Sequence, residues 1–480
     1  MAIRRLSPLD AAWLVLESRD TPMHVGGLFE FTLPPEASED FLHEAFEEMR
    51  EVRAVPPPWN LKLVEAPVAG SLPLLQEERD VDIDYHFRHS ALPAPGGQRE
   101  LGILVSRLHS NQLDLHRPLW EMHLIEGLEG DRFAVYLKMH HSLIDGISGM
   151  RLMLRTLSTD PDVRGTPPFW AVGAGRRERP SARADEADDE PAAERGRAGG
   201  LLHDALSAAG AGAEVAGGLG RAAFRLSQAR VNGGPLKAPY SGPRSALSVQ
   251  LTGQRRFATQ QYELDRIKRL AKAADCTVND VVLWLCSTAL RRYLQEHGRL
   301  PDSSLTAGIP VNVRAEDDQS TGTAISFIIA ELGTDIADPR ERLDAINRST
   351  REAKRMLREL PSEALTPYTL AVNAPYIAGL VVGLGGRAPA PFSLGMSNVP
   401  GPPEPLYFNG ARLDALFPLS LLLHGNALNI TCVSYAGTLN FGLTGARDAL
   451  PHLQRLAIYM GEALEELDRL LASHTLTQRG

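Results

Sequence analysis

Two adjacent histidines, followed by an aspartate and a glycine, are the residues whose types and spacing best suit chemistry: His140-His141-Ser142-Leu143-Ile144-Asp145-Gly146. An imidazole has an ordinary pKa of about 6.5, so it can be neutral at pH 7 and still accept a proton. Such a group acts as a general base when it reaches a substrate and when a second group fixes its orientation. The elements around the histidines decide which of the two can do this.

The segment directly before the histidines, Phe133 to Met139, alternates as a β-strand does. Because successive side chains of a strand point to opposite faces, the large apolar residues at the odd positions share one face. The same phase places His141 on this apolar side and His140 on the other side. His141 is therefore the candidate general base, beside a row of side chains that could line either ordinary core or a channel for an apolar substrate.

Asp145 allows two interpretations. It precedes a helical pattern of apolar residues from Ile147 to Leu154, so its side chain could cap that helix. It could instead be an ionised carboxylate that pairs with an arginine of the other half of the chain and locks the loop holding His141. A buried carboxylate is costly unless it is paired, so a sequestered Asp145 would require a cation nearby, whereas an exposed one would favour the cap.

The composition limits the class of protein. With 480 residues the chain exceeds the size at which a single core usually keeps growing, which predicts about two to three domains. A net charge of −9 argues against a general nucleic-acid-binding protein. The three cysteines lack metal-ligand spacing and are typical of reduced thiols, and no apolar run of a secretory signal follows Arg4-Arg5. We expect a cytoplasmic protein without a metal site.

Residues 1–160 mix strand-like and helix-like patterns and predict an N-terminal subdomain that carries the histidine pair. The predicted elements are a strand at 23–33, a helix at 99–112, and a hairpin at 120–140 that turns near 127–131. Residues 161–245 predict a linker, because 173–200 almost lack large apolar groups and cannot offset the entropy of ordering. Within it, residues 201–230 favour either a helix that bridges the two halves or an amphipathic segment at a membrane surface.

Residues 246–480 predict a C-terminal subdomain of similar make-up. The pattern indicates helices at 277–297, 339–360 and 450–471, and strands near 305–313, 324–334, 392–397, 427–435 and 438–443. The most apolar window, 368–384, is interrupted by Asn373 and Pro375 and falls short of the ~20 apolar residues of a spanning helix. It predicts a buried or interface-seeking helix pair. An active site between the two halves would be natural.

The run at residues 140–146 resembles the HHxxxDG signature of acyltransferases with the chloramphenicol-acetyltransferase and condensation-domain fold. Five further runs resemble one branch of that superfamily, the bacterial wax ester synthase/diacylglycerol acyltransferases. They stand in family order along nearly the whole chain except the linker: Leu6-Ser7-Pro8-Leu9-Asp10 with Pro22-Met23-His24-Val25-Gly26-Gly27, Arg117-Pro118-Leu119-Trp120-Glu121, Val278-Asn279-Asp280-Val281, and Ser397-Asn398-Val399-Pro400-Gly401-Pro402.

The resemblance implies an α/β fold of α+β type. Two chloramphenicol-acetyltransferase-like subdomains of mixed sheet and helices would form a pseudo-dimer in one chain, joined by a long linker. It also implies direct transfer of an acyl group from acyl-CoA, as cosubstrate, to the hydroxyl of a long-chain alcohol or a diacylglycerol. In that scheme His141 removes the alcohol proton and returns it to the departing CoA thiolate, and no further cofactor is expected.

The resemblance also assigns roles to residues outside the histidine run. His140, Asp145 and Gly146 complete the catalytic motif, and Arg314 would pair with Asp145. Asn279, Ser397 and Asn398 carry amide or hydroxyl donors that could stabilise the developing oxyanion. Alternatively, Thr277 and Asp280 form a reciprocal helix cap and residues 397–402 form a Pro/Gly turn. A structural role is expected for Pro118, Leu119, Trp120 and Asp280.

Two other functions remain open on the sequence alone. One is an acyltransferase of the same fold that uses an amine or a carrier-bound acceptor, and the other is a silent scaffold protein of lipid bodies. The intact run at 140–146 favours the enzyme. Because its ester products would be insoluble in water, we expect peripheral contact with the inner membrane surface or with lipid droplets, through 368–384 or 201–230. A monomer and a homodimer are both admissible.

Overall fold

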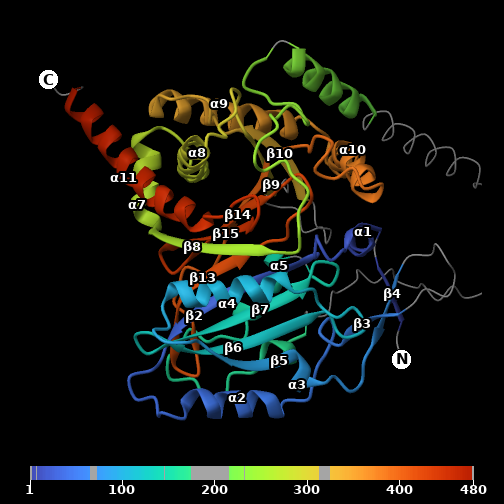
Figure 1. The fold of residues 1–480 in the computed structure, drawn as a ribbon, viewed down its shortest axis with the longest axis vertical. Helices are drawn as coiled ribbons and strands as arrows, with labels where there is room; N and C mark the ends of the chain where they lie inside the picture. The colour runs from blue at the N-terminus through green and yellow to red at the C-terminus, as the bar shows by residue number, and fades with distance from the viewer. Residues whose placement is uncertain are drawn as a thin grey trace, which may run out of the picture.

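The structure, a computed structural model, describes residues 3–6, 8–64, 73–144, 146–173, 216–231, 233–312 and 325–477. These residues form two lobes, each built around a six-stranded sheet, which stand one above the other in Figure 1. The predicted class, two subdomains of mixed sheet and helices in one chain, is confirmed.

The first lobe takes most of its elements from the N-terminal third of the chain. They are β1 (Ile3–Arg5), α1 (Pro8–Leu16), β2 (His24–Thr32), α2 (Phe41–Glu51), β3 (Leu61–Val64), β4 (Leu74–Glu77), α3 (Ile83–His86), β5 (Phe87–Ala91), α4 (Gln98–Ser110), β6 (Trp120–Leu128), β7 (Arg132–His140), α5 (Gly146–Leu154) and the 3₁₀ turn η1 (Phe169–Ala171). The second lobe follows residue 245. Its elements are β8 (Arg255–Glu263), α7 (Leu264–Ala273), α8 (Val278–Glu296), β9 (Thr306–Asn312), β10 (Ile325–Glu331), α9 (Pro339–Arg358), α10 (Ser362–Val381), β11 (Leu394–Pro400), β14 (Leu428–Tyr435), β15 (Thr438–Ala446) and α11 (Leu453–Thr477). The strands β12 (Tyr407–Phe408) and β13 (Ala411–Leu419) come from the same half of the chain but belong to the first sheet.

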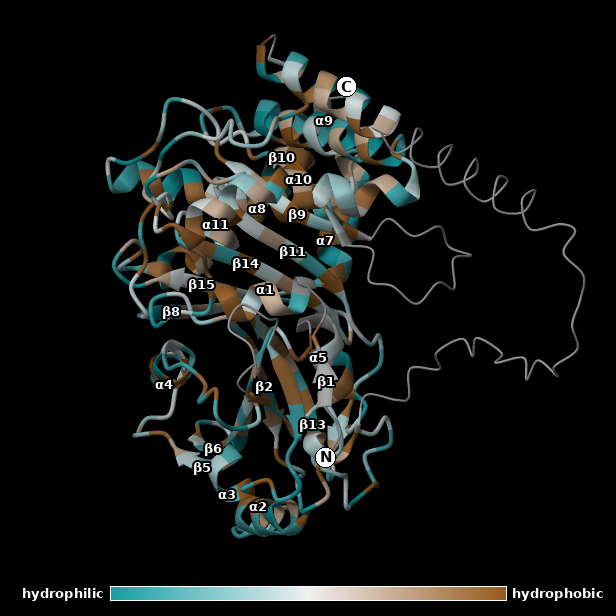
Figure 2. Ribbon diagram, turned by 90° about the vertical axis from the view of Figure 1, so that its right-hand side faces the viewer, coloured by the Kyte–Doolittle hydropathy of each residue, from teal (hydrophilic) through white to brown (hydrophobic). Residues whose placement is uncertain are grey.

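Strand β7 lies inside the first sheet, whose order is β12-β13-β2-β7-β6-β5. Its odd-numbered side chains, from Phe133 to Met139, belong to one buried cluster, while Ala134 and Tyr136 belong to another. The predicted alternation of faces is therefore confirmed. Figure 2 shows the apolar strands of both sheets running through the interior of the lobes.

The second sheet has the order β10-β9-β11-β14-β15-β8. Helices α8, α9 and α11 share a large buried cluster with one face of this sheet, which includes Ile309, Ile328 and Ile430. Helix α11 packs along β8 at one edge of the sheet, whereas α10 packs along β10 at the opposite edge. The two helices accordingly lie on opposite sides of the lobe (Figure 1).

The two lobes exchange structure, which the sequence did not indicate. Strands β12 and β13 belong by position to the second half of the chain, yet β13 pairs with β2 and completes the first sheet. Helix α4 of the first lobe also contacts the second lobe: its Ser106 and Ser110 accept hydrogen bonds from the backbone of β8 at 3.0 Å and 2.9 Å. The lobes are thus joined by shared strands and not by the linker alone.

Most predicted elements agree with the observed ones, but three predictions need correction. The window 368–384 is not a helix pair: it lies in the single helix α10 and its C-terminal extension, and much of it is exposed. The helix at 216–231, the described part of the segment predicted to bridge both halves, packs against Leu360 and Pro361 and the core of the second lobe. Of the predicted linker 161–245, residues 161–173 instead belong to the first lobe, where Phe169 and Trp170 are buried, and residues 174–215 lie outside the described residues. Within the described helices, none is long and apolar enough to cross a membrane.

Candidate active site

His141 is the first residue after β7, and its backbone N–H donates to the carbonyl oxygen of Met23 at 2.9 Å. Its half-buried imidazole lies against the indole of Trp13 on α1, with ring centroids 4.3 Å apart and planes inclined by 37°. This contact holds the imidazole in one orientation.

His140 is buried and holds the turn that follows β7. The backbone N–H of Ser142 donates to His140 Nδ1 at 3.1 Å, and Ser142 Oγ lies 2.7 Å from the same nitrogen. Because Nδ1 accepts a hydrogen bond from a backbone N–H, we assign the ring proton to Nε2, which faces Glu17 Oε2 at 3.4 Å. His140 therefore fixes the loop through its contacts with Ser142 and Glu17.

The carboxylate of Glu17 connects α1 to both histidines, although its side chain is only 4% exposed. Its Oε2 atom accepts the backbone N–H of Met23 and faces His140, while Oε1 accepts a hydrogen bond from Gln112 Nε2 at 2.7 Å. Since the Met23 carbonyl in turn accepts the N–H of His141, Glu17 supports one histidine directly and the other through one backbone unit.

A layer of buried polar side chains lies behind the loop, on the same face of the sheet as His140. His24, which pairs with His140 across β2 and β7, donates from Nε2 to the carbonyl of His109 at 2.9 Å. His109 Nδ1 lies 2.9 Å from the hydroxyl of Tyr136. Burial lowers the pKa of His109 to about 3, and burial also lowers the pKa of His24 well below its usual value.

We expect this layer to make the protein sensitive to acid. Above pH 6.5 both histidines are neutral in the folded and the unfolded chain. Below pH 6.5 both histidines become protonated in the unfolded chain, whereas in the folded chain His109 stays neutral down to about pH 3. The free energy of unfolding should therefore fall as the pH falls from 6.5, by about 1.4 kcal/mol per pH unit for each histidine. Urea unfolding at pH 7, 6 and 5 measures this slope.

The variant His109→Gln should reduce the pH slope of the unfolding free energy by about 1.4 kcal/mol per pH unit, because glutamine does not titrate. His116→Gln is the matched control, since the side chain of His116 is 94% exposed. If His109→Gln and His116→Gln keep the same pH slope as the wild type, the buried histidine is not the source of the acid sensitivity.

Lys138 and Glu121 form a sealed ion pair in the same layer. Lys138 Nζ lies 3.1 Å from Glu121 Oε2 and donates to the carbonyl oxygens of Leu108 and Asn111 at 3.2 Å and 2.9 Å. Burial raises the pKa of Glu121, but the neighbouring His123, Lys138 and Arg88 outweigh burial and lower that pKa to about 2. Burial lowers the pKa of Lys138. The pair anchors the end of β7 to β6 and to the end of α4.

The residues expected to be structural are indeed deeply packed. Leu119 and Trp120 are fully buried, the Trp120 ring stacks on His86 at 4.5 Å, and the Leu119 carbonyl accepts the N–H of His140 at 2.9 Å. Asp280 forms the reciprocal cap with Thr277 at the start of α8. It also accepts a hydrogen bond from Thr350 Oγ1 at 2.6 Å, which accounts for its buried carboxylate.

The three candidate oxyanion donors line one cavity. Along the described strands, β9 pairs with β11 only near Leu394 and Gly395, so the two strands separate further along β11. A small cavity opens there, lined by Asn279, Val282, Leu283, Ile309, Met396, Ser397, Asn398, Ile430 and Cys432. Three residues chosen from motifs more than 110 positions apart in the chain thus meet at the start of α8.

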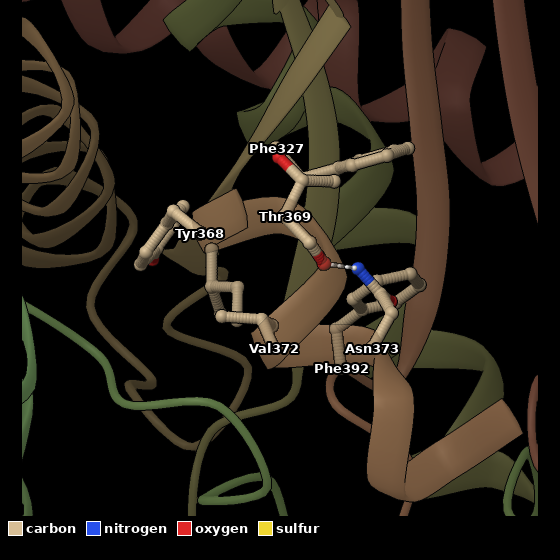
Figure 3. A pocket seen from close by; sticks show the side chains of 7 residues that line it. Phe327, Tyr368, Thr369, Val372, Asn373 and Phe392 are labelled. Atoms are coloured by element: carbon tan, nitrogen blue, oxygen red, sulfur yellow. Dashed lines mark hydrogen bonds between the residues drawn. The ribbon is translucent and has the colours of Figure 1, made fainter. Parts of the chain in front are cut away.

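A second small cavity lies between β10 and α10 (Figure 3). Phe327, Ile329 and Phe392 of the sheet side face Tyr368, Thr369, Val372 and Asn373 of the helix. Asn373 Nδ2 donates to the carbonyl of Thr369, so the amide is used within the helix and the lining is mainly apolar. Sequence analysis did not find this cavity, because its walls come from segments up to 65 residues apart.

Two predicted site residues, Asp145 and Arg314, lie outside the described residues, so their ion pair stays a prediction. Gly146 is the first residue of α5. Helix α5 packs closely on β7 because Gly149 has no side chain: a Cβ there would overlap the sulfur of Met139. Among the residues that the structure describes, no group of three or more metal-binding side chains comes together.

Comparison with known proteins agrees with the motifs. The family model described as the wax ester synthase/diacylglycerol acyltransferase catalytic domain matches residues 6–282, and the model of its C-terminal domain matches residues 321–468. A Mycobacterium tuberculosis relative whose name assigns it to the diacylglycerol O-acyltransferases is 45% identical, over 97% of each chain. The O-acyltransferase WSD of Acinetobacter baylyi is 39% identical, over 98% of each chain.

Solved structures give the same result. The wax ester synthase/diacylglycerol acyltransferase from Marinobacter aquaeolei VT8 is 36% identical, with a TM-score of 0.76 over 98% of this chain and 100% of that one. The first condensation domain of the CDA synthetase, at 17% identity and a TM-score of 0.55, shares the fold. The resemblance inferred from the motifs is confirmed, and the chain is an acyltransferase that belongs to the wax ester synthase/diacylglycerol acyltransferase family.

Proposed function

We propose that the enzyme moves a fatty acyl group from acyl-CoA to the hydroxyl of a long-chain alcohol or a diacylglycerol, with His141 as general base. The position of His141 carries the proposal. Its imidazole stands at the end of a buried strand, against the ring of Trp13, in a turn that His140 and Met23 fix. An imidazole that is held in one orientation and still half-buried is suited to proton transfer.

In the proposed reaction the hydroxyl oxygen of the acceptor attacks the thioester carbonyl while His141 takes the hydroxyl proton. The carbon–sulfur bond then breaks, and the imidazolium returns the proton to the CoA thiolate, so ester and free CoA are formed without an acyl-enzyme. A thioester is already activated, so most of the rate enhancement can come from aligning two substrates, which is worth up to ~7–11 kcal/mol in well-oriented systems. The single base adds typically ~10² to 10⁴ in rate.

The cavity at the start of α8 is the proposed place where negative charge on the carbonyl oxygen is stabilised. Asn279, Ser397 and Asn398 all line it and all carry hydrogen-bond donors. We assign the neighbouring Asp280 to structure, since its carboxylate is already used by Thr277 and Thr350.

The acceptors and the ester products are apolar, so we place the enzyme in the cytoplasm at the inner membrane surface or at lipid droplets. Two lobes in one chain can supply the whole site, so a monomer suffices for turnover.

A CoA-release assay tests the proposal. Purified full-length protein is supplied with acyl-CoAs of several lengths and with either hexadecanol or dioleoylglycerol as acceptor. Release of free CoA that depends on one of these acceptors, together with the matching ester on extraction, is the expected result. Turnover only with an amine or a carrier-bound acyl donor would contradict the proposed substrates, and no turnover with any pair would contradict enzymatic activity.

We further expect Glu17→Gln to lower the turnover number by roughly tenfold while the KM values for both substrates change little. Glutamine keeps the size of the side chain but has one acceptor oxygen fewer for the N–H groups of Met23, Gln112 and His140. A buried donor that loses its partner costs about 1–3 kcal/mol, and here the loss loosens the turn that carries His141. Steady-state kinetics with saturating acyl-CoA measure the change.

Glu44→Gln on the exposed side of α2 is the matched control, because it makes the same substitution far from the histidine loop. An unchanged turnover number in Glu17→Gln would show that the loop does not need this carboxylate. A rise in KM alone would point instead to a role in binding.

A further inference from the structure

The apolar side chains on the surface of this protein gather in one region. In the described residues, ten large hydrophobic side chains are exposed, and seven of them lie on α1, on α10 with its extension to residue 384, or on the helix at 216–231. They are between 48% and 83% exposed: Val15, Phe224, Val231, Leu370, Val381, Val382 and Leu384. Exposed apolar patches of this kind mark sites of contact with proteins or membranes.

Helix α10 forms the centre of this region. The chain has no Asp, Glu, Lys or Arg from residue 364 to residue 386. After its first turn, the exposed positions of α10 follow the helical repeat and are all apolar, forming a stripe that consists of Leu370, Ala371, Ala374, Pro375, Ala378 and Val381. A helix that is apolar on all sides is normally buried. The exposed side of α10 therefore indicates a surface that contacts another apolar surface or a lipid.

The helix at 216–231 adds positive charge to the region. It carries Arg221, Arg225 and Arg230 and no acidic residue. Arg225 pairs with Glu359, whereas Arg221 and Arg230 lie on the exposed side of the helix together with Phe224. The helix meets the start of α10, because a Cβ at Gly218 would lie 2.8 Å from Pro361. Basic and aromatic residues on one exposed helical side are typical of segments that lie on anionic lipid surfaces.

Helix α1 links this region to the candidate base. It packs against α10, with Val15 exposed on the outside, and it carries Trp13, whose ring contacts His141. We infer that the exposed side of α10 with its extension to residue 384, the outer side of the helix at 216–231 and Val15 form one docking face for an anionic phospholipid bilayer. The face sets the membrane beside the loop of His141, so that an apolar acceptor can pass from the lipid to the base.

The role of this face in acceptor delivery rests on the proposed function, but vesicle binding can be measured without turnover. The full-length protein is mixed with vesicles of pure phosphatidylcholine or with 30% phosphatidylglycerol, and flotation measures the bound fraction. Because the two kinds of vesicle differ only in anionic lipid, comparing them separates binding by apolar insertion from binding by charge attraction. We expect binding to the anionic vesicles that is stronger than binding to the neutral ones and that weakens as salt is added.

The variant Val381→Asp/Val382→Asp should lower the partition coefficient on both kinds of vesicle by roughly tenfold or more, because carboxylates do not enter the apolar layer. Arg221→Ala/Arg230→Ala should lower it by roughly tenfold on the anionic vesicles only. Ile458→Asp on α11 is the matched control, since Ile458 is 56% exposed at the opposite edge of the lobe. Val381→Ser/Val382→Ser replaces the aspartates if that variant does not fold.

Binding of the Val381→Asp/Val382→Asp variant that equals the wild type would overturn the inference, as would an equal loss in Ile458→Asp or no vesicle binding by the wild type. If the variant instead turns a dimer into a monomer on gel filtration and keeps its vesicle binding, the face is a contact between two copies of the chain. Turnover of a water-soluble short-chain alcohol by a variant that no longer floats would separate docking from catalysis. Flotation without any turnover would leave the docking face standing and overturn the proposed function alone.

Discussion

Replacement of His141 by alanine is expected to lower the turnover number by ~10² to 10⁴ with either acceptor, because the substitution removes the one base of the proposed reaction. The KM for acyl-CoA should change by less than about threefold, since the imidazole acts on the acceptor hydroxyl and its loss mainly affects the transition state. The fold should persist, because the His141 side chain is half-buried and the turn is held by backbone bonds and by His140. CoA release under saturating substrates measures the effect, and circular dichroism checks the fold.

Two controls keep this result specific. His116→Ala removes an exposed histidine and should leave the turnover number unchanged. His140→Ala should also lower activity but should destabilise the protein as well, because its ring is buried and holds Ser142. Ester formation by His141→Ala at the wild-type rate would remove this residue from the mechanism.

The substitution Lys138→Met is expected to cost about 3–5 kcal/mol of unfolding free energy, the largest stability effect that the structure indicates. Its ammonium is sealed from solvent and serves Glu121 and two backbone carbonyls at once. Methionine fills a similar volume but leaves the Glu121 carboxylate buried, with Arg88 at 3.8 Å as a more distant cation. Urea unfolding at pH 7 followed by tryptophan fluorescence measures the loss.

The double variant Lys138→Met/Glu121→Gln should recover part of this loss, because the uncompensated charge is then gone as well. Lys268→Met is the matched control: Lys268 pairs with Asp265 at 3.2 Å, but both side chains are more than half exposed, and such pairs are worth at most about 1 kcal/mol. A loss below 1 kcal/mol in Lys138→Met would mean that the buried pair contributes little to stability.

In the histidine loop, side-chain direction could be predicted from the sequence, but the residues that support the loop could not. Alternation along 133–139 separated His141 from His140 correctly, because a strand fixes side-chain direction at every residue. The support of that loop could not be predicted in the same way: Trp13 and Glu17 lie more than 120 positions before it, and no local pattern connects them. Lys138 did carry a signal, since a lysine inside an apolar strand is rarely buried without a partner, and Glu121 is that partner.

The fold was predictable wherever periodicity was strong. Helices α8 and α9 and strands β2, β6, β7, β14 and β15 begin and end close to their predicted positions. Strand β13 was missed because Asp414 and Pro418 interrupt its pattern, and the chain shifts register near residue 414. Helix α10 was predicted as a helix pair because Asn373 and Pro375 interrupt its apolar run, whereas the structure has one helix that contains both residues.

The exchange of β13 between the lobes has a consequence for how the chain is made. The strand β2 can gain its second neighbour only after residue 419 has left the ribosome, long after β7 has been synthesised. At roughly 5–20 residues per second, that interval lasts on the order of tens of seconds. During it the nascent N-terminal half exposes an unpaired strand edge, which is prone to aggregation, so folding in the cell should depend on a chaperone that shields this edge until synthesis is complete.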